Sequence, residues 1–130
     1  MIEITHESIP LDQIFASTRD ENAGGNVYFI GTIRKEEKVE EIKYQSYIPL
    51  AKKQLEEVVK EARQNWPLKK VAVVHRIGSV PVGEAAVVIA VSSAHRKEAF
   101  QACGFLIDRI KEIVPIWKEG GASCCLAHSE

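Results

Sequence analysis

The chain has 130 residues, of which 45% are hydrophobic, so it is long enough to bury one core and about the size of one domain. Its 17 basic and 18 acidic residues give a formal net charge of −1, which argues against nucleic acid or an anionic membrane as partner. No apolar run approaches the roughly 20 residues of a membrane span, and the first ten residues lack the basic and apolar regions of a signal peptide. We therefore expect one cytoplasmic domain over residues 1–130.

The chain opens with a pattern typical of a strand followed by a helix. Residues 2–5 alternate like a short strand, and a helix is expected to begin near Pro10. Ile14 and Phe15 are predicted to lie on the inner face of this helix. The polar and glycine-rich run at 21–26 then ends it.

Two further strands are predicted in the next part of the chain. Residues 27–34 are rich in β-branched and aromatic side chains, and residues 39–48 alternate apolar with polar side chains. Only the polar loop at 35–38 separates these two runs. We therefore expect them to pair as a hairpin.

A helix is predicted over residues 49–66, ending before Pro67. Its lysines and glutamates lie on the face opposite the apolar stripe. The stripe consists of Leu50, Leu55, Val58, Val59 and Ala62. Two apolar runs follow, at 70–78 and 84–94, and both are typical of buried strands. The connection "SVPVGE" between them is too short for a crossover, so the two should be antiparallel.

The last helix is predicted over residues 95–114, and Pro115 should end or kink it. Its apolar stripe consists of Phe100, Cys103, Leu106, Ile107, Ile110 and Val114. The elements together predict an α+β fold in which antiparallel strands pack against two long helices. The tail at 119–130 has little periodicity and is expected to be a flexible extension.

The cysteines and histidines favour neither a disulfide framework nor a metal site. Cys103 lies within a helical apolar pattern, whereas Cys124 and Cys125 are adjacent in the tail, which suggests a reducing compartment. No group of His, Cys, Asp and Glu has a recognised zinc spacing. His75 lies at the end of an apolar strand and is interpreted as structural. We expect no metal and no cofactor.

The segment 92–96 combines capping and cationic side chains. Ser92 or Ser93 can cap the last helix, which would place His95 and Arg96 in its first turn. The helix dipole favours negative charge at that end, so the two cations suit a bound anion such as phosphate. The alternative is that both point into solvent at a small cost, and spacing alone does not decide between the two.

A second candidate lies at the end of the strand at 27–34. Gly31 allows a close backbone approach, and Arg34 projects at the strand end, where a guanidinium can contact a ligand. Taken alone, Arg34 is more often a surface charge. Phe29 is more often part of a core than a stacking platform.

Lys111 and Lys118 lie on either side of Pro115. A seven-residue offset stacks two side chains along one helix face, and a kink at the proline still allows both amines to converge. Trp117 would then anchor the chain and fix the direction of Lys118. The alternative is two ordinary lysines that complement the dipole at the end of a helix.

Taken together, these residues resemble the catalytic large subunit of molybdopterin synthase. The resemblance covers nearly the whole chain in five ordered blocks, which are "NVYFIGTIR", "YIPLAKKQL", "NWPLKKVAVVHRIGSVPVGE", "VSSAHRKEAF" and "IKEIVPIWKE". It implies an α/β-hammerhead fold and a homodimer that binds a ubiquitin-like small subunit at each end, giving a heterotetramer. The small subunit ends in a Gly-Gly thiocarboxylate. Its sulfur would pass twice to cyclic pyranopterin monophosphate and give the dithiolene of molybdopterin, a step of molybdenum cofactor biosynthesis.

The resemblance also implies which residues form the substrate pocket. These are Phe29, Thr32, Ile33, Arg34, His95, Arg96, Lys111, Lys118, Glu119 and Gly120. Arg34, His95 and Arg96 would bind the phosphate or ring oxygens, with Lys118 as the central catalytic amine and Lys111 beside the thiocarboxylate. Because clustered cations lower the pKa of a lysine, one amine would act as base or nucleophile while the other stabilises negative charge.

The chain departs from the family pattern just after Lys118. "EGG" stands where a basic residue and then Glu are usual, and the tail from Glu119 to Glu130 contains no Lys or Arg. The family's tail also supplies basic residues that reach the pocket of the partner subunit. A non-catalytic anion-binding or assembly subunit that docks the sulfur carrier is therefore the alternative function.

Overall fold

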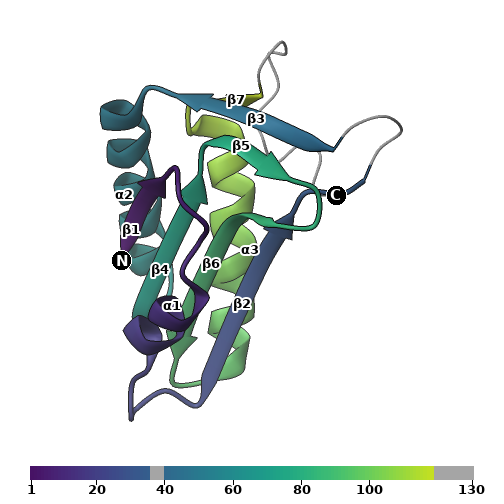
Figure 1. Ribbon diagram of the computed structural model, residues 1–130. Coiled ribbons are helices and arrows are strands. Elements are labelled where there is room, and N and C mark those ends of the chain that lie inside the picture. Colours follow the sequence, from purple (N-terminus) through teal and green to yellow (C-terminus); the bar gives the residue numbers. More distant parts are fainter. Residues whose placement is uncertain (36–39, 119–130) are drawn as a thin grey trace.

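The computed structural model describes residues 1–35 and 40–118 (Figure 1). Its main sheet has four strands in the order β1-β4-β6-β2. These are β1 (Ile2–Thr5), β4 (Leu68–Arg76), β6 (Ala85–Ser93) and β2 (Gly25–Thr32). β1 is parallel to β4, and the other neighbours are antiparallel. The antiparallel pairing predicted for the two apolar runs, now β4 and β6, is confirmed.

A smaller sheet lies across one end of the main sheet (Figure 1). Its order is β5-β3-β7, with β5 at Gly78–Pro81, β3 at Glu41–Ser46 and β7 at Ile116–Lys118. β5 occupies the connection between β4 and β6, and β7 follows the last helix. Neither was predicted, because strands of four and three residues are too short for a periodic signal.

The predicted hairpin between residues 27–34 and 39–48 is wrong. β2 pairs with β6, whereas β3 pairs with β5 and β7 in the other sheet. At Ile33 the N–H donates to the carbonyl of Glu84 at 3.0 Å, and the carbonyl accepts from the N–H of Gly83 at 2.8 Å. Both backbone groups of Ile33 are therefore bonded to the turn before β6, and not to residues of β3.

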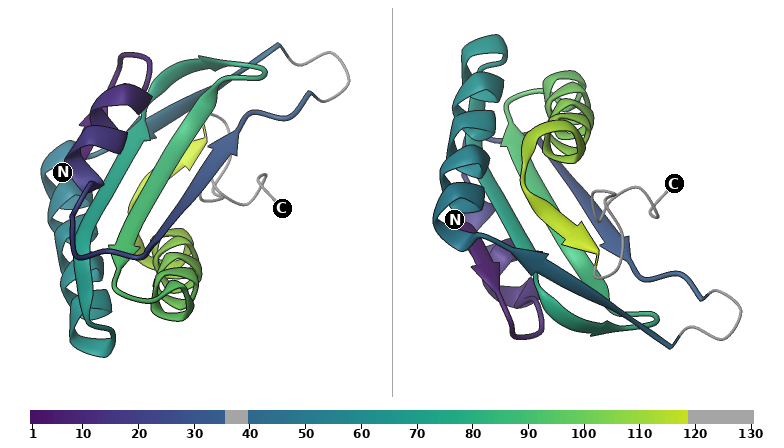
Figure 2. Two further views of the ribbon diagram at one scale, coloured as in Figure 1. Left: turned by 90° about the horizontal axis from the view of Figure 1, so that it is seen from below. Right: turned by 90° about the horizontal axis from the view of Figure 1, so that it is seen from above.

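In the part of the chain that the structure describes, three helices cover the two faces of the main sheet (Figure 2). α2 (Ile48–Asn65) and α3 (Arg96–Ile113) lie side by side on one face, and α1 (Leu11–Thr18) packs against β4 and β6 on the other. The predicted α+β fold, with antiparallel strands against two long helices, is confirmed. Within the described residues, no helix combines the length and the apolar character needed to cross a membrane.

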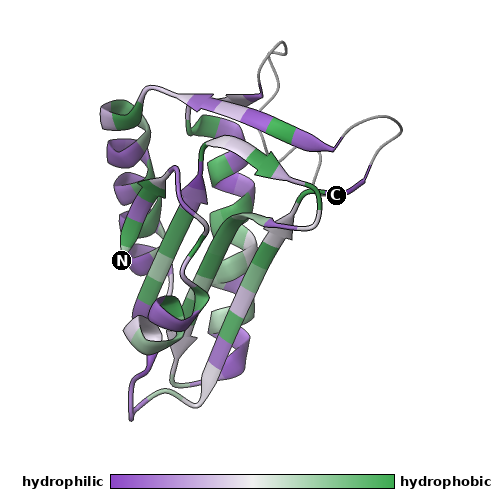
Figure 3. Cartoon of the chain, viewed as in Figure 1, coloured by the Kyte–Doolittle hydropathy of each residue, from purple (hydrophilic) through white to green (hydrophobic). Residues whose placement is uncertain are grey.

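The core lies on both faces of the central strands, which explains the unbroken apolar runs at 71–74 in β4 and 85–91 in β6 (Figure 3). Val73 and Ile89 are fully buried toward α2 and α3. Val74 and Val88 are buried on the opposite face, where Ile14 of α1 covers them. At roughly 1.5–3 kcal/mol per buried aliphatic side chain, this two-sided burial is the main source of stability.

Three aromatic or aliphatic side chains predicted to be buried are exposed. Phe15 is 44% exposed, Leu50 42% and Phe100 63%. In α1, Ile14 takes the inward position, so the ring of Phe15 lies to the side, in edge contact with Tyr28 at 4.8 Å. In α3, small residues such as Ala99 contact the sheet and displace Phe100 outward. The remaining members of the predicted stripes are buried or partly buried.

Candidate active site

The end of β2 holds the first predicted site residues. Thr32 and Arg34 are exposed, whereas the side chain of Ile33 is 6% exposed and belongs to the core. Ile33 can therefore offer a ligand little besides its backbone, and both of its backbone groups are already bonded to the turn at Gly83 and Glu84. This residue fixes the chain at the point where Arg34 leaves the sheet.

Phe29 lies in the middle of β2 and is partly buried against the main core. An ideal Cβ built on Gly31 would lie 3.2 Å from its ring and 2.8 Å from Cγ1 of Val87. Gly31 therefore leaves the space that the ring of Phe29 occupies. The core role expected from the sequence is confirmed.

Lys111 and Lys118 lie at the same end of the molecule as Arg34. Lys111 is in the last turn of α3, which ends at Ile113, directly before the Val114–Pro115 pair, as the proline predicted. The chain then turns into β7, where Lys118 lies opposite Tyr44 of β3. Lys118 is thus positioned by a strand, and not by a continued or kinked helix.

The predicted anchor of Lys118 is wrong, because Trp117 is 42% exposed. Ile116 is 1% exposed and holds the strand in the core. The Ser46 hydroxyl donates to the carbonyl of Pro115 at 3.1 Å, which fixes the bend before β7. Alternation along a strand places Lys118 on the same face as Ile116 and opposite Trp117.

An open cleft of about 250 Å³ lies at this bend and is lined by residues 111–117. It is smaller than the roughly 300–1,000 Å³ of typical ligand pockets. Lys111 lines the cleft, whereas Lys118 does not. Glu119 and Gly120, which were predicted as members of the substrate pocket, lie outside the described residues, as does the tail at 119–130.

His95 and Arg96 lie at the other end of the molecule. Arg96 is the first residue of α3 and Lys111 is in its last turn, so at about 1.5 Å per residue the two lie roughly 22 Å apart. Figure 1 shows the two ends of α3 at opposite ends of the main sheet. The expectation that both cations and both lysines face one pocket therefore does not hold within a single chain.

The predicted cap of α3 is also wrong. Ser92 and Ser93 belong to β6, and the cap position is His95, without a side-chain hydrogen bond. Ser92 accepts from the N–H of Lys70 at 3.0 Å, and Ser93 donates to the carbonyl of His95. The serines are thus used to fix the chain before the helix, which leaves the helix end open.

A close backbone contact holds His95 and Arg96 in place. The N–H of Gly24 donates to the carbonyls of Ser93 and Ala94, at 3.0 and 3.2 Å. An ideal Cβ on Gly25 would lie 2.7 Å from Cα of Arg96. The sequence predicts only that the run containing this glycine pair ends the first helix, whereas in the structure the glycines also allow the start of β2 to approach α3.

Two buried groups have shifted pKa values. Burial lowers the pKa of His75 from 6.5 to about 4, although its bond to the carbonyl of Arg76 partly opposes this. The ring is fully buried in edge contact with Tyr44, at 5.7 Å between centroids, which confirms the structural interpretation. Burial raises the pKa of the Cys103 thiol to about 11. Neither is a reactive group at neutral pH.

No group of three or more His, Cys, Asp and Glu side chains that could hold a metal is found in residues 1–35 and 40–118. The chemistry of the described site therefore consists of amines, guanidinium groups and one exposed imidazole. Such groups bind anions and stabilise developing negative charge.

Comparison with known proteins gives consistent results. A family model described as MoaE protein matches residues 4–113. The molybdopterin synthase catalytic subunit of Staphylococcus aureus (strain COL) is 44% identical over 120 residues, which cover 90% of this chain and 81% of that protein. The human molybdopterin synthase catalytic subunit is 38% identical over 122 residues, which cover 92% of this chain but only 65% of the human protein. A crystal structure of molybdopterin synthase from Staphylococcus aureus matches with a TM-score of 0.86 and 42% identity, covering 94% of each chain.

Proposed function

The chain belongs to the MoaE family, and from that premise we propose that it is the catalytic subunit of a molybdopterin synthase in the cytoplasm. It would transfer sulfur from the C-terminal thiocarboxylate of a ubiquitin-like small subunit to cyclic pyranopterin monophosphate. The observation that supports this most directly is that Lys111, in the last turn of α3, and Lys118, in β7, lie on either side of the bend at Pro115, at the end of the molecule that carries Arg34.

The chemistry requires amines at the acyl carbon that carries sulfur. In each transfer the carbon–sulfur bond of the thiocarboxylate breaks and a carbon–sulfur bond to the pterin side chain forms. An oxygen from water, or one displaced from the pterin side chain, replaces sulfur on the acyl carbon, and the small subunit leaves as a carboxylate. Two small subunits are therefore consumed for each dithiolene. A charged lysine stabilises the negative charge that develops on oxygen, and a neutral lysine can accept a proton or attack the acyl carbon.

We propose further that the active unit is a homodimer within a heterotetramer and that the pocket is completed across the dimer. His95 and Arg96 lie roughly 22 Å from Lys111. This is too far for these side chains of one chain to contact the same molecule of cyclic pyranopterin monophosphate. In a two-fold symmetric pair, one end of each chain can meet the other end of its partner. The cations at the start of α3 would then bind the substrate's phosphate beside the lysines of the other chain.

The assignment is tested with the purified chain, the thiocarboxylated small subunit and cyclic pyranopterin monophosphate. We expect dithiolene product from the natural sequence and at least about a 100-fold lower kcat for Lys118→Ala, the scale on which loss of one transition-state contact acts. The kcat of Lys111→Ala, measured separately, shows how much each of the two amines contributes to the rate. Lys53→Ala, on the exposed face of α2, is the matched control and should keep full activity.

Two results would contradict this proposal. Full activity of Lys118→Ala would remove the assigned amine from the mechanism. Binding of the small subunit without any product from the natural sequence would instead select the alternative, a non-catalytic subunit that docks the sulfur carrier.

A further inference from the structure

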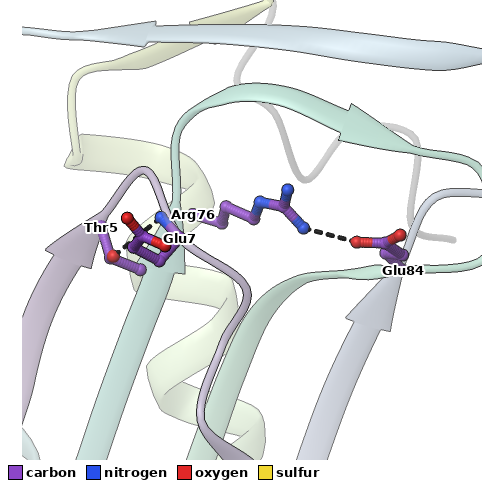
Figure 4. Close-up of polar contacts among 4 residues, drawn as sticks. All are labelled: Thr5, Glu7, Arg76 and Glu84. Carbon is purple, nitrogen blue, oxygen red and sulfur yellow. Dashed lines mark hydrogen bonds and ion pairs between the residues drawn. The ribbon is translucent and has the colours of Figure 1, made fainter.

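An ion pair joins the two ends of the segment that leaves the main sheet after β4, forms β5 in the small sheet and returns at β6 (Figure 4). Nη1 of Arg76, the last residue of β4, donates to Oε1 of Glu84, directly before β6, at 2.6 Å. The side chain of Arg76 is 12% exposed and that of Glu84 49%. Residues 77–83 between them form β5 and its turn. The pair therefore links the point where the chain leaves the main sheet to the point where it returns.

The turn that carries Glu84 also holds both ends of the segment that follows Arg34. On one side, the N–H of Ile33 donates to the carbonyl of Glu84 at 3.0 Å and the N–H of Gly83 donates to the carbonyl of Ile33 at 2.8 Å. On the other side, the N–H of Val82 donates to the carbonyl of Glu40 at 2.8 Å. Gly83 adopts a φ of +88°, which makes this tight turn possible. Two of these backbone bonds hold Ile33, directly before Arg34, and the third holds Glu40, directly before β3.

The other end of this arrangement is equally fixed. Arg76 lies in register with Thr5 of β1, and the N–H of Ile77 donates to the carbonyl of Thr5 at 2.8 Å. Its guanidinium then extends from the sheet toward Glu84, and among the residues described its buried Nε has no hydrogen-bond partner. A charged side chain that leaves one donor unsatisfied is a poor source of stability, so its geometry needs another explanation.

We propose that Arg76 and Glu84 are positioning residues for Arg34. The ion pair holds the turn at 82–84 against the main sheet, and the turn holds the strand end from which the Arg34 guanidinium reaches the substrate. The role in catalysis rests on the proposed function, since Arg34 is assigned to the pocket there. A displacement of about 1 Å in a substrate-contacting group can cost on the order of 100-fold in rate. A small shift of Arg34 would therefore be measurable as a loss of activity.

The kinetic test is a double-mutant cycle between Arg76 and Arg34. Arg76→Ala should lower kcat/KM for the cyclic pterin by about 10- to 100-fold, mainly through KM, and Arg76→Lys should recover part of the loss. If Arg76 acts through Arg34, adding Arg76→Ala to Arg34→Ala should change kcat/KM by less than about two-fold. A merely structural residue would multiply the two losses, and that result would overturn the proposal.

The matched control is the ion pair between Arg109 and Glu61, which joins α3 to α2 at 3.1 Å and is distant from the turn. Arg109→Ala removes a guanidinium from an ion pair between two helices and should leave kcat/KM unchanged. An equal loss in this variant would show that any broken ion pair has the same effect, which would also overturn the proposal.

A second measurement does not depend on turnover. In Arg76→Ala, hydrogen exchange at the amides of Ile33 and Gly83 should become at least about 10-fold faster, while that of Ile89 in the core stays unchanged. Unchanged exchange at the first two amides would refute the clamp itself. If the natural sequence forms no dithiolene, the proposed function fails, and the exchange result still decides whether Arg76 holds the turn.

Discussion

The two ends of α3 both carry cations, but they are built in opposite ways. At the C-terminal end, Lys111 complements the helix dipole, and Lys118 is held by a strand of the small sheet. At the N-terminal end, Arg96 opposes the dipole, with Glu98 in the same turn, and the backbone there is pressed against two glycines. Only the second end is electrostatically unfavourable without a ligand, so it is the stronger indication of an anion site.

The comparison also separates what each end requires. The lysine end depends on side chains and strands from three distant parts of the chain, namely β3, β7 and the turn before β6. The His95 end depends on one backbone contact between β2 and the start of α3. Changes directed at either end should therefore have distinct effects, which the following predictions use.

The largest expected effect is recovery of activity by two inactive chains. Lys118→Ala and Arg96→Ala damage opposite ends, so a heterodimer of the two retains one undamaged pocket if pockets form across the dimer. We expect the heterodimer, isolated with two affinity tags, to regain about half of the natural dimer's activity. Lys111→Ala paired with Lys118→Ala is the control, because both changes lie at one end and no pocket is left complete. Lack of recovery in the first pair would place all site residues in one chain.

Acid should weaken the lysine end through His75. Its pKa is lowered from 6.5 to about 4 by burial, so the unfolded chain binds this proton first and stability is lost as pH falls through that window. At about 1.4 kcal/mol per pH unit, the loss between pH 6.5 and 4 is roughly 3 kcal/mol. Urea unfolding of the natural chain and of His75→Asn at several pH values measures it. An equal pH dependence of stability in the natural chain and in His75→Asn would contradict the prediction.

Gly25→Ala should weaken the other end. The added Cβ would lie 2.7 Å from Cα of Arg96, which forces the backbone apart and should cost about 1–3 kcal/mol of unfolding free energy. Gly104→Ala is the matched control in α3, since its Cβ meets nothing within 4 Å. It should stabilise the helix by roughly 0.5–1 kcal/mol. Thermal unfolding of both variants gives the comparison, and two shifts of the same sign would refute it.

The smallest effect is expected midway along α3. Burial raises the pKa of Cys103 to about 11, so its thiolate is scarce at pH 8. Iodoacetamide followed by peptide mapping should find Cys103 unmodified in the folded chain and alkylated after unfolding. Rapid modification under native conditions would show that the segment between the two ends opens readily.

Much of the fold follows from periodicity in the sequence. The long helices and the β4–β6 pair were predicted because each offers ten or so residues of consistent pattern and a short connection. The hairpin failed for a different reason. Whether β2 pairs with β3 or with β6 depends on contacts such as that of Ile33 with the turn at Glu84, and no local pattern around Ile33 specifies a partner that distant.

The site residues also fall into those that the sequence predicts and those that it does not. The residue types and the break at Pro115 were available from the sequence, and the end of α3 confirms the latter. The separation of Arg96 from Lys111 was also available in principle, because a helix of this length fixes the distance between its ends. What could not be predicted was the use of Arg76 and Glu84, since an ion pair across a short excursion has no sequence signal apart from the two charges.

The strand order also bears on how the chain is made. β1 pairs with β4, and β2 pairs with β6. Ile2 therefore cannot pair until Val73 has been synthesised, and Gly25 cannot pair until Ser93 has been synthesised. Sheets dominated by such distant pairings fold in roughly milliseconds to seconds, far more slowly than helical bundles. During synthesis, both edge strands must therefore remain unpaired until most of the polypeptide has left the ribosome. Slow codons or a holding chaperone would have their greatest influence on yield in that interval, before β6 is complete.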